Sequence, residues 1–368
     1  MKKKGGGNEG GIKMKKVLLA VAALALIAGG YFLASSHTTP AQAAEKSMPK
    51  LHGIAFISGE GGHIAMVNLA TMKSPTDVEK DRIVITEAGS EMEGKIAGMT
   101  MEQAKKGGGM HGAALVGGKL YAGLLDGNVV VYDLKTGKKS APIKVGQKFC
   151  DAVVGPDGKH IYFEDMANGH VYEWDYKTMK TVDEFPIGAA VCGIQWVNNG
   201  RKAYVSDMPT GIIYVLDWKT KKVIKKITDP QMTFIHQIHL TPNGRQLWVS
   251  APNEYDPGLK PPTHKSQIVV IDTRTDKVID HIVLPPHRYS HDLAFSPDGK
   301  WVLIPARTYQ KDSRLMIMNE KTHAIVEDIS VCESCHKPNG IEVKMAEGHP
   351  NLCGITVAWG MKHKPVTE

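Results

Sequence analysis

The chain has 368 residues, of which 42% are hydrophobic and 23% charged, and these values are typical of a folded globular body rather than a disordered chain. The 38 glycines and 20 prolines indicate many tight turns, as all-β folds require. The formal net charge is +7, but six lysines precede the first apolar run and no basic stripe with interleaved aromatic residues follows, so we exclude a nucleic-acid partner.

The N-terminal residues have the pattern of an export signal. Lys13 to Lys16 form a positively charged segment, Val17 to Ala34 form an apolar run, and Ala41 to Ala43 supply small residues for cleavage. We therefore predict a signal peptide at residues 1–43, a linker at 44–51 and an exported, periplasmic body. The apolar run is also near the minimum length for a bilayer span, so an uncleaved anchor is the alternative, and it would be the protein's membrane contact.

A strand pattern recurs through the rest of the chain. In each copy, β-branched or aromatic residues lead into Asp/Asn-x-x-Thr, where the Asx side chain can bond the backbone two residues further on. The Asp or Asn residues are Asn68, Asp133, Asp175, Asp217, Asp272 and Asn319. Their spacing of about 40 to 65 residues is the period expected of propeller blades.

A hairpin precedes most copies of this pattern and closes with Asp-Gly or Asn-Gly, a turn that accepts positive φ angles. The hairpins that align without gaps are 150–158, 192–200, 236–244 and 291–299. With a further strand after each Asp/Asn-x-x-Thr, every repeat makes a four-stranded antiparallel sheet. We predict an all-β fold in which residues 52–368 form a single β-propeller of six such blades, or of seven if residues 90–109 contain another.

The first repeat lacks its innermost strand. Residues 53–58, 62–69 and 82–87 align with the second, third and fourth strands of the other repeats, and Cys353 to Trp359 supply the missing strand from the other end of the chain. We therefore expect this C-terminal strand to join the N-terminal blade. Closing the ring in this way removes the exposed sheet edges of an open array.

The chain after Leu51 resembles the YVTN-type β-propeller repeat family in two motifs, Ser-Pro-Asp-Gly-Lys at 296–300 and Ile-Val-Val-Ile-Asp-Thr at 268–273. Within that family it is similar to the propellers that bind d1-type haem in bacterial nitrite reductases and their relatives. The resemblance implies a propeller fold and a periplasmic setting. Those proteins usually have eight blades and a separate helical cytochrome domain, which this chain does not match, so the resemblance does not imply nitrite chemistry.

The sequence Cys332-Glu333-Ser334-Cys335-His336 has the spacing of a c-type haem attachment motif. Two thiols at this separation can form thioether bonds to the haem vinyl groups, and the adjacent His336 can bind the iron. Such attachment takes place outside the cytoplasm, in agreement with the export signal. A Cys332–Cys335 disulfide and half of a zinc site are the alternatives, but no second Cys/His pair with zinc spacing is evident. We predict one covalent haem c.

The haem motif lies between the last strand of the sixth repeat, at 324–330, and the closing strand that begins at Cys353. We expect a haem loop at residues 331–352, on the propeller face where the channel opens. The sixth iron ligand stays undecided among Met345, His349, His287 and Met110. A methionine ligand would favour electron transfer, and an open position would favour catalysis.

The repeat alignment places one residue of each blade at the start of its innermost strand, and all six are histidines or cysteines. They are His111, Cys150, Cys192, His236, His291 and Cys353. Innermost strands line the channel, so we expect these residues to form a His/Cys ring at one end of it. The ring could hold a second metal, or supply acid–base groups to a ligand or haem in the channel. The alternatives are an ordinary polar channel lining and a Cys150–Cys192 disulfide between neighbouring blades.

Together these patterns predict an exported haem c-binding propeller that acts in redox chemistry or electron transfer with a periplasmic redox partner. An enzyme of this kind would be an oxidoreductase acting on a small molecule such as a nitrogen or sulfur compound, and the sequence does not decide whether the protein is an enzyme. The alternative is a non-catalytic propeller subunit or binding module of a larger periplasmic oxidoreductase complex. A lactonase-type hydrolase is disfavoured, because such propellers usually line the channel with carboxylates and Asn around a metal.

Overall fold

The computed structural model describes residues 50–59, 63–72, 82–85, 109–197, 200–253, 265–307, 313–331 and 352–362. Residues 49–368 belong to one compact unit. The predicted signal peptide at 1–43, and the linker except for its last two residues, lie outside the described residues. Within the described ranges, no helix is long and apolar enough to cross a membrane.

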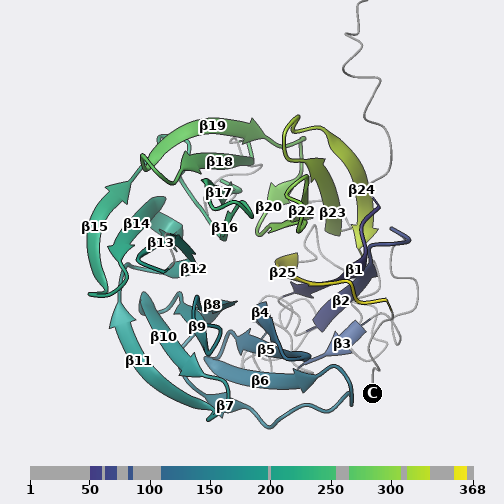
Figure 1. Cartoon of the computed structure of the whole chain (residues 1–368), viewed down its shortest axis with the longest axis vertical. Helices are drawn as coiled ribbons and strands as arrows, with labels where there is room; N and C mark the ends of the chain where they lie inside the picture. The colour runs from purple at the N-terminus through teal and green to yellow at the C-terminus, as the bar shows by residue number, and fades with distance from the viewer. Residues whose placement is uncertain are drawn as a thin grey trace, which may run out of the picture. The chain divides into compact units, whose positions relative to one another are not determined.

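Six antiparallel sheets are arranged as the blades of a ring (Figure 1), and in the second to sixth blades the strands follow one another in chain order from the inside outward. The second blade contains β4 (Met110–Val116), β5 (Lys119–Leu124), β6 (Asn128–Asp133) and β7 (Ile143–Lys144). The third contains β8 (Phe149–Val154), β9 (His160–Asp165), β10 (His170–Asp175) and β11 (Lys180–Pro186). The fourth contains β12 (Val191–Val197), β13 (Lys202–Asp207), β14 (Ile212–Asp217) and β15 (Lys222–Ile227), with a single 3-10 turn at Met208–Thr210.

The fifth blade contains β16 (Ile238–Leu240), β17 (Gln246–Ala251), β18 (Gln267–Asp272) and β19 (Lys277–Val283). The sixth contains β22 (Trp301–Arg307), β23 (Ser313–Asn319) and β24 (Ile325–Val331), and its innermost strand is split into β20 (Tyr289–Ser290) and β21 (Ala294–Phe295). The all-β propeller of six four-stranded blades is therefore confirmed over the described residues. Residues 90–108, which the alternative count of seven required, lie outside them.

The first blade is closed by the C-terminus, as predicted. It has the order β25 (Leu352–Trp359), β1 (Gly53–Gly59), β2 (His63–Asn68) and β3 (Arg82–Val84). Strand β25 pairs antiparallel with β1 from Gly53, opposite Trp359, to Ile57, opposite Ile355. The innermost strand of this blade therefore comes from the opposite end of the chain to its other three strands, and it completes the ring.

Turn chemistry sets the strand register, as the repeats indicated. The Asp133 carboxylate accepts the backbone N–H groups of Lys135 and Thr136, and Asp272 accepts the backbone and hydroxyl groups of Thr275. The Thr275 hydrogen bonds lower the pKa of Asp272 below its usual range. In the hairpins, Gly158 and Gly299 have φ angles of 63° and 70°, which side chains with a Cβ disfavour.

Six apolar clusters fill the spaces between neighbouring sheets. Between the first and second blades, for example, Phe56 and Met66 pack with Leu124. Between the sixth and first blades, Leu303 and Ile57 belong to one cluster. Burial of these faces stabilises each blade against the next and makes the ring, rather than a single sheet, the unit that folds.

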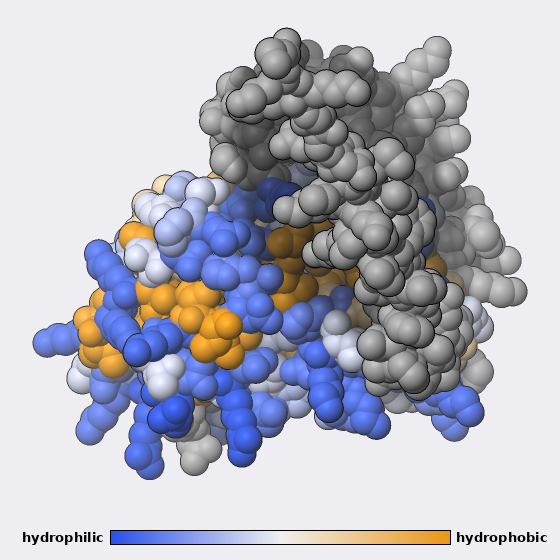
Figure 2. Space-filling model, turned by 90° about the horizontal axis from the view of Figure 1, so that it is seen from above, coloured by the Kyte–Doolittle hydropathy of each residue, from blue (hydrophilic) through white to orange (hydrophobic). Residues whose placement is uncertain are grey.

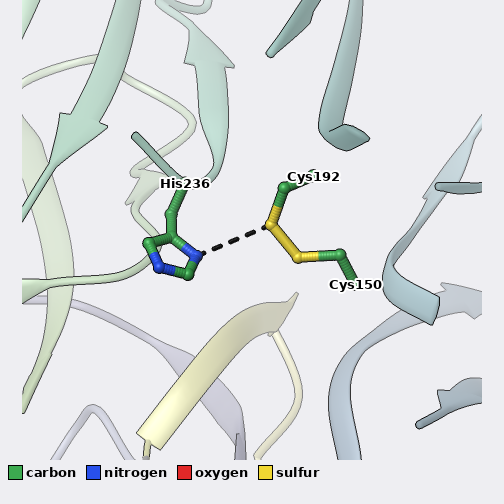
Figure 3. Close-up of side chains that lie close together, drawn as sticks. All are labelled: Cys150, Cys192 and His236. Carbon is green, nitrogen blue, oxygen red and sulfur yellow. Dashed lines mark hydrogen bonds between the residues drawn. A yellow bond between two sulfur atoms is a disulfide. The ribbon is translucent and has the colours of Figure 1, made fainter. Parts of the chain in front are cut away.

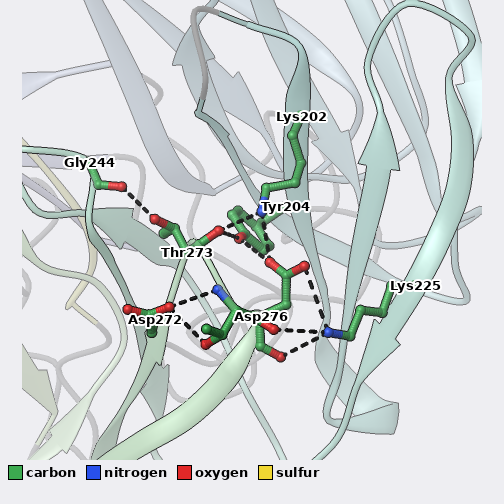
Figure 4. Close-up of polar contacts among 8 residues, drawn as sticks. Lys202, Tyr204, Lys225, Gly244, Asp272, Thr273 and Asp276 are labelled. Carbon is green, nitrogen blue, oxygen red and sulfur yellow. Dashed lines mark hydrogen bonds and ion pairs between the residues drawn. The ribbon is translucent and has the colours of Figure 1, made fainter.

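Polar contacts also join the fourth and fifth blades (Figure 4). The buried Tyr204 hydroxyl donates to the Thr273 carbonyl at 3.1 Å and to the Asp276 carboxylate. Lys202 Nζ donates to the same two groups at 2.6 and 2.8 Å, and Lys225 Nζ lies 3.7 Å from the other Asp276 oxygen. The turn after β18 is thereby held against β13.

The outer rim carries apolar residues bordered by hydrophilic ones (Figure 2). The exposed large apolar residues of the described chain are Val182 on β11, Val223 and Ile224 on β15, and Ile279 and Val283 on β19. Lysines alternate with or flank them on the same strands, as in Lys222, Lys225 and Lys226. Charged side chains of this kind oppose edge-to-edge pairing with other sheets.

Candidate functional site

The six residues of the predicted His/Cys ring lie on or beside the innermost strands of their blades. His111, Cys150, Cys192 and Cys353 belong to β4, β8, β12 and β25, and His236 and His291 lie beside β16 and β20. Their exposed fractions range from 0% for Cys150 and Cys192 to 6% for His111. The ring is thus a buried polar layer contributed by all six blades.

A disulfide joins Cys150 and Cys192 across the third and fourth blades, with the two Cα atoms 5.1 Å apart (Figure 3). An imidazole lies against each sulfur: His111 Nδ1 is 3.6 Å from Cys150 Sγ, and His236 Nδ1 is 3.6 Å from Cys192 Sγ. The His291 ring lies beside that of His236, with centroids 3.7 Å apart. Five of the six ring residues therefore form a chain of contacts, and the disulfide alternative is the one the structure contains.

Cys353 is buried at the junction of the ring with the closing strand and is not part of a disulfide. Next to it, the Gly354 N–H donates to the Ser58 hydroxyl at 3.0 Å, and that hydroxyl donates to the His111 carbonyl. A Cβ at Gly354 would lie 2.6 Å from the His111 carbonyl oxygen, closer than a carbon can approach. Glycine at 354 therefore lets β25 of the first blade approach the backbone of β4 in the second blade.

A β-bulge lies at the ring residue of several innermost strands. In the third blade, Phe149 pairs with Asp165 and Asp151 pairs with Glu164, so Cys150 is the extra residue. The same shift in register occurs between Val191 and Gly193 in β12, between Met110 and Ala113 in β4, and between Ile57 and Gly59 of β1 opposite β25. A bulge re-aims consecutive side chains, so the residue after each ring residue also approaches the channel.

These following residues form a second layer, which the sequence analysis missed. They are Gly112, Asp151, Gly193, Gln237, Asp292 and Gly354. Two of the glycines leave the space that a larger side chain of the next blade occupies. A Cβ on Gly112 would lie 1.6 Å from Asp151 Oδ1, and one on Gly193 would lie 3.1 Å from Gln237 Oε1.

Three carboxyl groups are buried in or beside the second layer. Asp151 and Glu164 lie opposite each other on β8 and β9, and Asp292 follows the ring residue of the sixth blade. Their exposed fractions are 7%, 0% and 1%. Burial, followed by the charge of Asp292, raises the pKa of Asp151 to about 7, and burial together with Asp151 raises the pKa of Glu164 well above its ordinary value. This part of the channel therefore retains protons near neutral pH.

Of these three carboxyl groups, Asp292 has the most hydrogen bonds. His239 Nε2 lies 2.6 Å from one of its oxygens, which also accepts the Leu293 N–H at 2.8 Å, and the other oxygen accepts the Ile355 N–H at 2.6 Å. Burial lowers the pKa of His239, but the adjacent Asp292 outweighs it, so the pKa of His239 is raised. Asp292 therefore connects the fifth, sixth and first blades through one ion pair and one backbone contact.

Glu164 differs from these groups because neither carboxylate oxygen has a hydrogen-bond partner within the described chain. The repeat alignment contained a signal for it. The equivalent positions in the other blades are Ser58, Gly123, Ser206, Ser250 and Pro305, all small or uncharged. The third blade is therefore the one blade with an ionisable residue at this position of the repeat.

Neither described candidate for the sixth iron ligand is itself a member of the ring. Met110 is completely buried in the apolar cluster between the first and second blades, with Phe56 and Met66. His287 is exposed in the turn between β19 and β20, with a φ angle of 59°. The haem motif Cys332, Cys335 and His336, and the candidates Met345 and His349, lie outside the described residues.

The connection that carries the motif has well-defined ends. Residues 332–351 join β24, the outermost strand of the sixth blade, to β25, the innermost strand of the first. Cys353 is the second residue of β25, so the C-terminal end of this connection is next in sequence to a residue of the His/Cys ring.

Comparison with protein families finds one match, to the family described as cytochrome D1 heme domain, over residues 189–344. Residues 189–344 resemble a heme domain. The match covers the fourth, fifth and sixth blades and extends across the Cys332 to His336 motif, and it amounts to less than half of the chain. It indicates a haem-binding or redox role, in agreement with the prediction at that level, and does not distinguish haem c from haem d1.

Two solved structures show what the chain is similar to in space. The hydrazine synthase of Kuenenia stuttgartiensis matches with 18% identity and a TM-score of 0.48, over 57% of this chain and 62% of that chain. This chain thus spans less than two thirds of the hydrazine synthase chain. The β-propeller domain of Cps50 (Swd1) from Myceliophteria thermophila matches with 17% identity and a TM-score of 0.42, over 60% of this chain and 86% of that domain. No curated protein sequence matches the chain.

Proposed function

We propose that the chain is an exported propeller that binds one haem c covalently and acts in redox chemistry or electron transfer. Cys332 and Cys335 would form the thioether bonds and His336 would bind the iron. The observation that carries the proposal is the heme-domain match over 189–344, which includes a complete attachment motif. Export would supply the compartment in which such attachment takes place.

The chain topology supports a haem position near the channel end. The connection that contains the motif is held at one end by β24 and at the other by β25, whose second residue is Cys353 of the His/Cys ring. A group attached within this connection is therefore tethered on both sides to the propeller. From His111 to His291 the ring side chains lie in contact, with two sulfur–nitrogen distances of 3.6 Å and the His236 and His291 ring centroids 3.7 Å apart. A macrocycle would therefore have to lie beyond these five residues rather than between them.

The buried Asp151 and Glu164 beside the ring would supply protons to such a group. Haem, when bound, supplies one-electron redox chemistry. Asp151 and Glu164 hold protons at a pH where exposed carboxyls have lost them, because burial raises their pKa. His239, held by Asp292 at 2.6 Å, is an imidazole outside the ring that interacts electrostatically with Asp151. These groups could exchange protons with a ligand at the channel end.

The attachment is tested by producing the chain with its own N-terminus in a host that matures c-type cytochromes. We expect an absorption spectrum of thioether-linked haem in the exported fraction, and a protein mass increased by one haem. The double variant Cys332→Ser with Cys335→Ser should lose both signals, whereas Cys353→Ser should keep them. Colourless protein from a competent host would refute covalent haem binding.

Electron transfer and small-molecule chemistry are separated by the same spectrum. A six-coordinate haem that does not change when nitrite or hydroxylamine is added would support electron transfer to a periplasmic redox protein. A five-coordinate haem whose spectrum shifts with one of these ligands would support an oxidoreductase acting on a nitrogen compound.

Loss of the haem when synthesis begins at residue 44 would support the predicted signal peptide.

A further inference from the structure

The Cys150–Cys192 disulfide has an environment that ordinary structural disulfides do not need. Both sulfurs are buried in the channel, and each has an imidazole nitrogen 3.6 Å away, from His111 on one side and His236 on the other. Gln237 Nε2 also points at Cys150 Sγ from 3.8 Å. Two thiol-derived sulfurs and two imidazoles are the ligand set of many tetrahedral zinc sites.

The two sulfur–nitrogen contacts have the spacing of zinc ligands. Zinc bonds of about 2.3 Å to sulfur and about 2.0 Å to nitrogen, at a tetrahedral angle, put the sulfur and nitrogen about 3.6 Å apart. Both observed sulfur–nitrogen distances are 3.6 Å. The ligand atoms of Cys150, Cys192 and His236 all lie within 4.8 Å of one another (Figure 3). His111 is not part of this group, but its Nδ1 lies 3.6 Å from Cys150 Sγ.

We propose that reduction of the Cys150–Cys192 disulfide creates a binding site for a divalent zinc-like cation, with the two thiolates, His236 and His111 as ligands. The oxidised ring cannot bind the ion in this way, because the two sulfurs are bonded to each other. The site is therefore opened and closed by the redox state of one disulfide. It is independent of the haem and of the proposed function.

The chemistry balances with a dithiol as the reductant. One dithiol passes two electrons and two protons to the disulfide, so the S–S bond breaks, Cys150 and Cys192 become thiols and the reductant becomes a disulfide. The cation then displaces both thiol protons. The filled site, with a dipositive ion, two thiolates and two neutral imidazoles, carries no net charge, which matters in a buried layer where an uncompensated charge is costly.

The test uses the complete protein with Cys332 and Cys335 replaced by serine, so that the haem motif cannot bind the probe, and Co²⁺ as the probe. Dithiothreitol reduces the folded protein under anaerobic conditions, a thiol assay counts two additional thiols, and gel filtration removes the reductant before Co²⁺ is added. We expect one tightly bound Co²⁺ that Zn²⁺ displaces. X-ray absorption at the cobalt edge should show two sulfur and two nitrogen ligands. The oxidised protein should show no sulfur ligation.

Variants separate the ligands from the rest of the ring. His236→Ala keeps the disulfide and should weaken Co²⁺ binding to the reduced protein by more than about tenfold. Cys192→Ser should leave one sulfur ligand, and the matched control Cys353→Ser should keep two. Co²⁺ bound without sulfur, wild-type affinity in His236→Ala, or a disulfide that dithiothreitol does not open in the folded protein would each overturn the proposal.

Discussion

Glu164 is a completely buried carboxyl group whose oxygens have no hydrogen-bond partner among the described residues. Asp151 lies opposite it on the neighbouring strand, so two acidic side chains share one buried cross-strand position. Burial and the charge of Asp151 raise the pKa of Glu164. The fold therefore keeps this group protonated at a pH where a surface glutamate would be ionised.

The variant Glu164→Gln tests this state. A carboxyl whose pKa is higher in the folded than in the unfolded chain stabilises the fold fully at low pH, and this stabilisation is lost as pH rises through the folded pKa. Asp151, with a pKa of about 7, titrates in the same direction, so wild-type stability should fall between about pH 4 and pH 7. We expect the glutamine variant to be more stable than wild type by about 1–3 kcal/mol at pH 8 and no more stable at pH 4.

Urea unfolding at pH 4, 6 and 8 measures the effect. The matched control is Glu184→Gln on β11, whose side chain is 45% exposed and lies near His170 at the surface, and which should change stability by less than about 0.5 kcal/mol. A Glu164→Gln variant that is less stable than wild type at every pH would mean that the carboxyl is ionised and held by partners in solution.

At the scale of strands and turns, Tyr204 on β13 holds the turn after β18 of the next blade. Tyr204→Phe removes one hydroxyl that donates to the Thr273 carbonyl and to Asp276, while Lys202 still contacts both. Because the lost hydrogen bonds are buried, we expect the free energy of unfolding to fall by about 1–2 kcal/mol.

Thermal or urea unfolding of wild type, Tyr204→Phe and a control variant tests this prediction. The matched control is Tyr176→Phe, because the Tyr176 hydroxyl donates to the Gly158 carbonyl at the surface, and this variant should stay within about 0.5 kcal/mol of wild type. Equal losses in both variants would show that the contact between the fourth and fifth blades contributes nothing particular.

The elements themselves were predictable because short-range chemistry specifies them. Asp-Gly and Asn-Gly turns and Asx side chains fix where strands begin, and the repeat period then fixes how many sheets form. The closing strand could be found because the first repeat lacked one strand and the C-terminus held one in excess. The His/Cys ring followed from the same alignment, since equivalent positions in a propeller lie at equal depth in the channel.

The chemistry beside the ring was harder to predict, because a regular strand directs successive side chains to opposite faces. On that rule Asp151 and Asp292 would point away from the channel when Cys150 and His291 point into it. The bulge at Cys150 breaks the alternation, and no turn residue or spacing in the sequence predicts a bulge there. The disulfide likewise stayed one of several alternatives, since Cys150 and Cys192 meet only when two blades pack together.

At the scale of the whole molecule, β25 is the element on which closure depends. It pairs with β1, its Gly354 N–H donates to Ser58, and its Ile355 N–H donates to Asp292 of the sixth blade. One strand therefore contacts the first blade, both of its neighbours and the His/Cys ring. Without it, β1 would lose its strand partner, Asp292 would lose the Ile355 N–H, and the apolar cluster between the sixth and first blades would lose Ile355.

Removing residues 352–368 should therefore destabilise the fold more than the loss of one edge strand destabilises an open sheet. We expect the shortened protein to lose cooperative unfolding and to aggregate, because the apolar cluster between the sixth and first blades loses Ile355 and the ring cannot close. Removing only residues 363–368 is the matched control, since β25 ends at Trp359, and it should unfold like wild type. A synthetic peptide of residues 351–362 should restore cooperative unfolding to the shortened chain, and calorimetry of all four samples measures this. Cooperative, peptide-independent unfolding of the shortened chain would show that the five complete blades hold the ring without the C-terminal strand.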